Sequence, residues 1–402
     1  MATNKVFIER QIHKLVKEHL KTRRISVITG MRRTGKTTIV KRVLEDINSS
    51  NKVYLDLQNV ETRDFFKERN FDNILLSLEN RFNINFKEKA YIAIDEIQLV
   101  PELPGIIKYL YDTYDIKFII TGSSSYYMKN LFTESLAGRK QIFELYPLTF
   151  GEFLDFKSVY HKDENLSDCT FNNHEYEGFK KYYEEYLEYG GFPEVVLEES
   201  NEAKKNLLVD ILSSYINIDV ESMSDFRKKE DYYSIVKVLA ERVGSKIDYS
   251  KISTIIGISR QTLNEYMSFF EDTYLIKRIP VWTNNKDREI VKAKKLYFID
   301  NGLLNILSDL SSGSKFENAI FNQLRHLGEI RYFSLKNGKE IDFIITINMK
   351  ETIALEVKET PIEADNGNLE YLAGLAGVKN YRLIGRNQSP TFSDYIWGGS
   401  IR

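Results

Sequence analysis

A glycine-bounded loop between a short apolar strand and a helix constrains this chain more than any other stretch. Residues 25–29 (Ile-Ser-Val-Ile-Thr) predict a buried strand, and a helix is expected to begin near Lys36. The residues between them fit the pattern G-x-x-x-x-G-K-[ST], with Gly30, Gly35, Lys36 and Thr37 at its fixed positions. Glycines let successive backbone N–H groups face one anion, and the helix N-terminus adds the positive end of its dipole. The sequence therefore predicts a site for nucleotide phosphates.

The polar side chains of this loop have expected roles in binding ATP and Mg²⁺. Lys36 is expected to reach the β- and γ-phosphates, and the Thr37 hydroxyl to ligate Mg²⁺. Arg32 and Arg33 are expected either to touch phosphates or to contact a neighbouring subunit. The full set of expected nucleotide-binding residues is Gly30, Arg32, Arg33, Thr34, Gly35, Lys36, Thr37 and Thr38.

Further apolar strands alternate with helical segments over residues 1–148. They are expected at residues 52–57, 91–96, 117–122 and 141–145. Strands that are nearly continuous in apolar residues are typical of a parallel sheet covered by helices on both faces. We therefore expect an α/β nucleotide-binding domain over residues 1–148.

The strand at residues 91–96 ends in two acidic residues. Asp95 is expected to hold Mg²⁺, and Glu96 to orient and activate a water against the γ-phosphate. An apolar strand ending in Asp-Glu is a weak signal alone, but here it follows a phosphate loop in the same predicted sheet. The pair therefore favours hydrolysis over nucleotide binding alone.

Two further polar positions resemble those of AAA+ ATPases. Thr121-Gly-Ser123 ends the strand at residues 117–122, at the sheet edge where ligands of open α/β sheets bind. Arg139 stands just before the strand at residues 141–145. The resemblance implies that Thr121 or Ser123 senses the γ-phosphate, and that Arg139 is a finger inserted into a neighbouring subunit's site. An exposed surface arginine is the alternative. A finger acting between subunits implies a homo-oligomer, and a hexameric ring or a dimer satisfies it.

The chain as a whole resembles a prokaryotic, archaeal and bacterial, family of AAA-type ATPases with a C-terminal region of uncharacterised function. This resemblance implies an ATPase but names no settled substrate. The motifs that carry it are Gly-Met-Arg-Arg-Thr-Gly-Lys-Thr-Thr from Gly30, Ile-Asp-Glu-Ile-Gln from Ile94, Thr-Gly-Ser-Ser-Ser from Thr121, Leu-Ala-Gly-Arg from Leu136, Tyr-Pro-Leu from Tyr146, Gly-Gly-Phe-Pro from Gly190 and Glu-Ile-Asp-Phe from Glu340.

Residues 149–228 have a helical pattern and are rich in acidic residues and tyrosine, which predicts a helical lid. The lid arginine that usually senses nucleotide lacks a counterpart, because no Arg occurs between Arg139 and Arg227. The Gly190-Gly-Phe-Pro193 segment interrupts the helical pattern. It is expected either to contact nucleotide or to form a turn between helices.

Residues 229–298 predict three helices and a hairpin, an order that resembles a winged-helix domain. Gly257-Ile-Ser259 forms the turn of a helix–turn–helix layout, whose second helix enters the major groove. Winged helices also bind proteins, and both roles remain open. The basic hairpin favours DNA, and Lys295 belongs to the same basic cluster. The expected DNA-binding residues are Arg260, Gln261, Thr262 and Asn264 in the helix, and Lys286, Arg288, Lys292 and Lys294 in the hairpin.

Residues 299–402 predict the order α-β-β-β-α-β, which resembles the PD-(D/E)XK nuclease fold. Period two puts Glu356 and Lys358 on one face of a strand, with Asp342 opposite on its hairpin partner. The resemblance implies that Glu317, Asp342 and Glu356 hold Mg²⁺, while Lys358 positions water or stabilises the pentavalent charge. The alternative is a degenerate nuclease fold kept for DNA binding or packing.

Composition sets broad limits. The 402 residues are 42% hydrophobic and 28% charged, as in ordinary globular proteins, and the net charge of −2 gives no general affinity for nucleic acid. The single cysteine, Cys169, excludes an intramolecular disulfide. No apolar run approaches the roughly 20 residues of a membrane span, and residues 1–10 lack a signal-peptide core. We therefore expect a cytoplasmic protein without a membrane partner.

The sequence thus predicts an α/β P-loop AAA+ domain with a helical lid, a winged helix and a restriction-endonuclease-like α/β domain. The leading hypothesis is Mg²⁺-dependent ATP hydrolysis coupled to binding and remodelling or translocation of duplex or branched DNA, with DNA cleavage by the last domain left open. A rival is a slow, nucleotide-gated signalling or defence switch acting on a protein partner, favoured by the missing lid arginine. A third hypothesis makes the nuclease primary and the ATPase its regulator.

Overall fold

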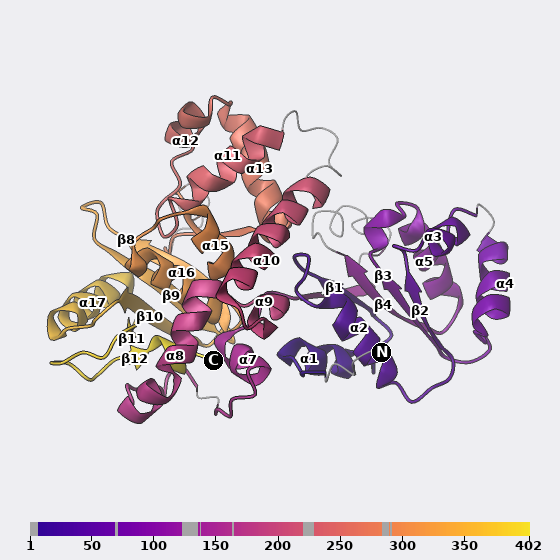
Figure 1. The fold of residues 1–402 in the computed structure, drawn as a ribbon, viewed down its shortest axis with the longest axis horizontal. Coiled ribbons are helices and arrows are strands. Elements are labelled where there is room, and N and C mark those ends of the chain that lie inside the picture. Colours follow the sequence, from indigo (N-terminus) through magenta and orange to yellow (C-terminus); the bar gives the residue numbers. More distant parts are fainter. Residues whose placement is uncertain are drawn as a thin grey trace. The chain divides into compact units, whose positions relative to one another are not determined.

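The computed structural model describes residues 7–68, 71–122, 136, 138–162, 165–219, 229–283, 289 and 292–402. The chain divides into two compact units (Figure 1). The first unit consists of Met1–Tyr146 with Asp272–Tyr274, and the second of Pro147–Glu271 with Leu275–Arg402. The phosphate loop lies in the first unit.

The first unit is built on a five-stranded parallel sheet with the order β2-β3-β4-β1-β5. Each strand lies within a residue of where the apolar runs predict it. An α/β fold with a parallel sheet is therefore confirmed. The strands are β1 (Ile25–Thr29), β2 (Lys52–Asp56), β3 (Ala90–Asp95), β4 (Ile116–Gly122) and β5 (Lys140–Glu144).

Helices cover both faces of this sheet, and its central strands β1 and β4 are buried along their whole length. Ile25 and Val27 pack into one core cluster, together with residues of α4 and α5, whereas Ile28 packs into a second cluster with α1 and α2. The alternation follows from the period of two along a strand. The helices are α1 (Gln11–His19), α2 (Lys36–Glu45), α3 (Val60–Phe65), α4 (Phe71–Phe82) and α5 (Leu103–Thr113), with a 3₁₀ turn η1 (Ile97–Leu99).

The second unit begins with helices, continues with a helical triplet and an antiparallel hairpin, and ends in a second sheet (Figure 1). The first helices are α7 (Phe150–Phe156), α8 (Asn173–Tyr189), α9 (Pro193–Leu197) and α10 (Asn201–Ser214), followed by a π-helical turn η2 (Tyr215–Asp219). The triplet is α11 (Lys229–Ala240), α12 (Tyr249–Ile256) and α13 (Arg260–Asp272), and the hairpin pairs β6 (Ile276–Ile279) with β7 (Lys295–Phe298). Helix α15 (Asn301–Leu307) follows the hairpin.

The second sheet has the order β12-β11-β10-β9-β8, with β8, β9 and β10 antiparallel and β10, β11 and β12 parallel. Leu369 and Leu372 of α17 pack on Ile341 and Ile344 of β9. The α-β-β-β-α-β order expected from the sequence is present, and the short β12 is an addition. The elements are α16 (Ser312–Leu324), β8 (Gly328–Ser334), β9 (Glu340–Ile347), β10 (Glu351–Lys358), α17 (Glu363–Ala376), β11 (Asn380–Gly385), β12 (Ile396–Trp397) and a 3₁₀ turn η3 (Gly398–Ser400).

The Gly190-Gly-Phe-Pro193 segment is a packing junction within the second unit. Gly190 ends α8 with a φ of 73°. Gly191 N donates to Asp300 Oδ2 at 2.8 Å, and Gly191 O accepts from Leu148 N at 2.7 Å. Asp300 also accepts from Leu303 N at the start of α15, and its burial raises its pKa to about 6. These contacts favour the turn between helices over a nucleotide contact.

We expect Gly191→Ala to destabilise the second unit by about 2 kcal/mol or more, the cost of forcing atoms into a filled space. A Cβ at Gly191 would lie 2.4 Å from Leu148 O, which is backbone and cannot swing aside. Denaturant unfolding measures the change. The matched control is Gly367→Ala in α17, where an added Cβ meets nothing within 4 Å. Equal stability of the two variants would contradict the packing role of Gly191.

Candidate nucleotide site and carboxylate cluster

The phosphate loop leaves β1 through residues with left-handed backbone angles. Gly30 has a φ of 157° and Gly35 of 99°, and Arg33 takes a φ of 62° between them. A Cβ at Gly30 would lie 2.0 Å from Leu145 O, so only glycine fits there. The buried Thr34 hydroxyl donates to Met31 O at 2.8 Å and closes the turn. The loop is therefore tightly curled, as phosphate binding by backbone N–H groups requires.

Two basic side chains hold this curl. Lys36 is buried, and its Nζ donates to Gly30 O at 2.9 Å and to Met31 O at 3.0 Å. Arg10 donates from Nη1 to Thr34 O and from Nη2 to Tyr146 O, each at 3.0 Å. Lys36 thus lies inside the loop, as the motif requires. Arg10 was not predicted, because the loop residue that it contacts, Thr34, lies 24 residues further along the chain.

Asp95 is the centre of the polar contacts next to the loop. Its Oδ2 accepts from Thr37 Oγ1 and from Tyr54 OH, each at 2.7 Å, and its Oδ1 accepts from Thr121 Oγ1. These donors come from α2, β2 and β4, which meet Asp95 at the carboxyl edge of the sheet. The structure therefore brings together the two predicted Mg²⁺ groups, Thr37 and Asp95, and adds two partners to Asp95.

Glu96 directly follows β3 in a left-handed conformation, with a φ of 59°. Its backbone N donates to Thr121 Oγ1 at 3.0 Å, and its carboxylate accepts from Gln98 Nε2. Thr121 thus contacts both predicted acidic residues. Ser123, the other predicted residue for that role, lies outside the described residues.

Tyr54 is a site residue that sequence reasoning missed. Burial and the hydrogen bond to Asp95 raise the pKa of Tyr54, so its phenol stays protonated and serves as a donor. The parallel register places Asp56 beside Asp95, and Tyr54 beside Ala93. The sequence contained one signal for it: Tyr54 is an aromatic residue with a hydroxyl group, and it lies near the carboxyl end of the strand that precedes β3.

We expect Tyr54→Phe to raise the Mg²⁺ concentration needed for half-maximal ATP turnover by about threefold to tenfold. The variant removes one hydrogen bond to a buried carboxylate, worth about 1 kcal/mol. Steady-state turnover measured over a Mg²⁺ series gives the shift. Tyr91→Phe is the control, because Tyr91 lies at the other end of β3 and pairs with Lys52 in register. An unchanged Mg²⁺ dependence in Tyr54→Phe would show that the Asp95 contact is dispensable.

Arg139 lies near the start of β1, whereas the phosphate loop of the same chain follows the end of β1. Ile25 N, at the start of β1, donates to Arg139 O at 2.8 Å, whereas the loop leaves from the end of that strand. Five strand residues span about 16 Å. The guanidinium makes a two-bond contact with Asp112, from Nε to Oδ1 at 3.0 Å and from Nη2 to Oδ2 at 3.2 Å. The structure therefore does not bring Arg139 to its own nucleotide site.

The predicted DNA-binding residues of α13 share its first turn. Arg260, Gln261 and Asn264 are exposed, whereas Thr262 is half-buried. Ser259 Oγ accepts from Thr262 N at 3.0 Å and so caps the helix, as its residue type predicts. In the hairpin, Lys292 is exposed and Lys294 half-buried, while Lys286 and Arg288 lie outside the described residues.

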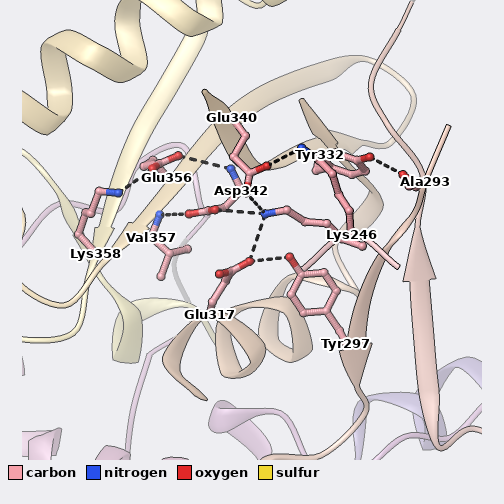
Figure 2. A network of polar contacts seen from close by, with 11 residues as sticks. Lys246, Ala293, Tyr297, Glu317, Tyr332, Glu340, Asp342, Glu356, Val357 and Lys358 are labelled. Atoms are coloured by element: carbon pink, nitrogen blue, oxygen red, sulfur yellow. Dashed lines mark hydrogen bonds and ion pairs between the residues drawn. The ribbon is translucent and has the colours of Figure 1, made fainter. Parts of the chain in front are cut away.

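The second sheet brings Asp342, Glu356 and Lys358 together as the period of two predicts (Figure 2). Asp342 Oδ2 accepts from Val357 N at 3.0 Å, and Lys358 Nζ lies 2.7 Å from Glu356 Oε1. Glu317 approaches from α16 and accepts from Tyr297 OH at 2.6 Å. We call Glu317, Glu340, Asp342 and Glu356 the carboxylate cluster.

Lys295 lies inside this cluster, and its expected place on an exposed basic hairpin was wrong. Its side chain is 1% exposed, with Nζ 3.0 Å from Glu340 Oε1, 3.4 Å from Asp342 Oδ1 and 3.5 Å from Glu317 Oε1. Burial alone lowers the pKa of Lys295, but the three carboxylates outweigh burial and raise it. The interaction energy gained from three acidic neighbours is what keeps this lysine charged and buried.

The carboxylate cluster does not fit the expected Mg²⁺ site. Burial and the nearby Asp342 charge raise the pKa of Glu317 to about 7 and of Glu356 to about 8. Within the part of the chain that the structure describes, no three His, Cys, Asp or Glu side chains are arranged to hold a metal ion. Lys295 explains this, because its ammonium already lies among the oxygens of Glu317 and Asp342. With this ammonium in place, the geometry does not support a metal ion held by Glu317, Asp342 and Glu356, and that role stays a prediction.

Two stretches of the chain match known family models. Residues 22–154 match a family model described as an AAA domain, and residues 180–314 match one described as a domain of unknown function. An uncharacterised protein of Haemophilus influenzae is 27% identical over 85% of both chains. An uncharacterised protein of Methanocaldococcus jannaschii is 28% identical over 85% of this chain and 77% of its own.

Among solved structures, the ADP form of the Aeropyrum pernix ORC2 protein aligns with 69% of this chain and 89% of its own, at 11% identity and a TM-score of 0.39. Similarity at this level does not indicate function. None of the described helices combines the length and the apolar character needed to cross a bilayer. From the AAA-domain match and the geometry of the loop, we conclude that the chain carries an AAA-type P-loop nucleotide-binding domain.

Proposed function

We propose that this chain is a Mg²⁺-dependent ATPase whose turnover is coupled to binding duplex or branched DNA. The observation that carries the ATPase part is the contact of Thr37 with Asp95 beside the curled loop that holds Lys36. A helix N-terminus, a lysine and a carboxylate meet there at one sheet edge. That combination suits a nucleotide phosphate chain together with its metal ion.

The residues present fit Mg²⁺. This ion prefers oxygen ligands and keeps several waters, so one or two protein oxygens are enough to bind it beside the phosphates. The Thr37 hydroxyl and the Asp95 carboxylate supply such oxygens, and Tyr54 and Thr121 orient the carboxylate by donating to it. When bound, Mg²⁺ would neutralise charge on the β- and γ-phosphates.

The remaining groups of the site have roles that follow from their positions. Lys36 would exchange its loop carbonyls for β- and γ-phosphate oxygens and bind them by charge. Glu96, at the end of β3, would accept a proton from the attacking water or orient it. Arg139 would act on the γ-phosphate bound to a neighbouring copy, since the length of β1 separates it from its own loop. This makes a homo-oligomer part of the proposal.

The DNA part of the proposal rests on the helical triplet and hairpin of the second unit. The order α11, α12, α13, β6 and β7 suits a winged helix, and Gly257 turns the chain between α12 and α13 with a φ of 78°. Three exposed donors, Arg260, Gln261 and Asn264, follow this turn. Such side chains at the start of a helix can reach base edges or phosphates in the major groove.

Fluorescence anisotropy with labelled duplex and four-way-junction DNA over a salt series tests this proposal. We expect salt-sensitive binding that weakens by about tenfold in the Arg260→Ala/Asn264→Ala variant, as expected on losing a base or phosphate contact. Arg382→Ala is the control, because Arg382 is an exposed arginine of the same unit, on β11. Absence of salt-sensitive affinity for every DNA form would remove the DNA part of the proposal.

A second candidate is a nucleotide-gated switch that hydrolyses ATP slowly and acts on a protein partner. It is favoured by the absence of any arginine between Arg139 and Arg227, and by the net charge of −2. Slow ATP turnover that no DNA form changes would support it. DNA cleavage is not part of the proposed function, because Lys295 occupies the carboxylate cluster.

A further inference from the structure

The carboxylate cluster already contains a cation that the chain itself supplies. We propose that the Lys295 ammonium permanently occupies the position that a divalent cation would take in this cluster. The wild-type chain would then bind no Mg²⁺ or Mn²⁺ there, and removal of the ammonium would open a divalent-cation site. The C-terminal sheet would carry nuclease-like carboxylates in a form that is closed to metal.

The distances support this replacement. Three carboxylates from two elements, Glu317 of α16 and Glu340 and Asp342 of β9, converge on one nitrogen within 3.5 Å. Oxygens gathered around one point are what a hard cation requires. Because Lys295 is 1% exposed, its charge is withdrawn from water, and these carboxylates are what compensates it.

The backbone around Lys295 fixes the ammonium in this place. Ile247 N donates to Lys294 O at 2.9 Å, and Leu296 N donates to Ser245 O at 3.3 Å, so the residues on both sides of Lys295 are hydrogen-bonded. Lys295 itself pairs with Ile279 in the hairpin. The ring of Tyr332 lies 5.8 Å from Nζ and covers the ammonium from another side. The backbone of Lys295 is therefore fixed by its place in a hairpin strand, and its ammonium is packed against Tyr332.

The other two lysines of the network differ from Lys295. Lys246 reaches Glu340 Oε2 at 3.1 Å, and Lys358 reaches Glu356 Oε1 at 2.7 Å (Figure 2). Both side chains are 37% exposed, and each is paired with a single carboxylate of the cluster at these distances. Neutralising either of them leaves Lys295 in place. Lys358 therefore provides a matched control for a lysine that touches the cluster without filling it.

The test is Mn²⁺ binding to the nucleotide-free, full-length chain, followed by the electron paramagnetic resonance signal of free Mn²⁺. The variants are Lys295→Met, which keeps the length of the side chain without its charge, Lys295→Met/Asp342→Asn, and the control Lys358→Met. Asp342→Asn alone identifies Mn²⁺ bound elsewhere, including at Asp95. Thermal unfolding with and without Mn²⁺ is measured on every chain.

We expect Lys295→Met to gain one Mn²⁺ per chain with an affinity at least about tenfold above any binding by the wild type, a difference of about 1.4 kcal/mol. The gain should disappear when Asp342→Asn is added, and Lys358→Met should behave like the wild type. Lys295→Met should unfold at a lower temperature than the wild type without Mn²⁺, because buried carboxylates lose their cation, and Mn²⁺ should raise that temperature.

Three results would overturn the proposal. The first is wild-type binding of Mn²⁺ that Asp342→Asn abolishes. The second is a folded Lys295→Met chain that gains no site. The third is a Lys295→Met chain that is unfolded and that millimolar Mn²⁺ does not restore, since a latent site would refill with the ion. The nucleotide loop lies in the other unit, so none of these results bears on the proposed ATPase.

Discussion

Lys36→Ala is expected to lower ATP turnover by about 100- to 1000-fold, the effect of removing one preorganised group that stabilises developing charge. Lys36 is buried in the curl of the loop, where its ammonium donates to Gly30 O and Met31 O. No other described residue supplies a buried ammonium inside this loop. Steady-state phosphate release by the purified variant measures the loss.

The matched control is Lys14→Ala, which removes an exposed lysine of α1 in the same unit. It should turn over ATP at the wild-type rate, and both variants should unfold at the wild-type temperature to within a few degrees. Turnover by Lys36→Ala within threefold of the wild type would show that the loop is not the site of hydrolysis.

Arg139→Ala is expected to lower turnover by about 1000-fold, in the range known for arginine fingers, with little effect on nucleotide affinity. Since Arg139 cannot reach its own loop, the loss should be repairable by a second chain. A mixture of Arg139→Ala and Lys36→Ala chains should regain part of the activity, because a Lys36→Ala copy offers its intact Arg139 to a neighbour with an intact loop. Phosphate release by each variant and by the mixture measures this.

Arg81→Ala, which removes an exposed arginine at the end of α4, serves as the control for Arg139→Ala and should be fully active. A mixture as inactive as its components would contradict the action of Arg139 between subunits. Wild-type turnover by Arg139→Ala would instead support the alternative, in which Arg139 is a surface residue paired with Asp112.

The first unit could be read from its sequence almost completely. Parallel strands such as β1 and β4 are buried on both faces and are therefore mostly apolar, so each appears in the sequence as a short, largely apolar run. The loop motif then fixes the polar residues at the strand ends. Tyr54 was not predicted, because its hydrogen bond to Asp95 depends on the order of the strands, which places β2 beside β3.

The helices and strands of the second unit could be predicted from the sequence, but the burial of Lys295 among carboxylates could not. Alternation along β9 and β10 correctly placed Asp342 beside Glu356 and Lys358. The position of Lys295 depends instead on how β7 packs against α16 and β9, which are distant in sequence. A lysine in a basic segment is usually exposed, and only three converging carboxylates make burial favourable.

Other residues remain predictions. Ser123, Lys286 and Arg288 lie outside the described residues, and the roles of Arg32 and Arg33 depend on nucleotide or on a neighbouring copy. Arg32 is half-buried and Arg33 exposed, which suits either partner. The expected partners of these residues are nucleotide, DNA or a neighbouring subunit, none of which is part of a single chain.

The most direct test of the account is ATP turnover by the purified chain without DNA and with single strands, plain duplex and a four-way junction, using Lys36→Ala as the inactive control. We predict that duplex or junction DNA stimulates turnover several-fold, and that the Arg260→Ala/Asn264→Ala variant loses this stimulation while keeping its basal rate. Turnover that responds to none of these DNA forms would contradict an ATPase coupled to DNA and would favour the protein-partnered switch.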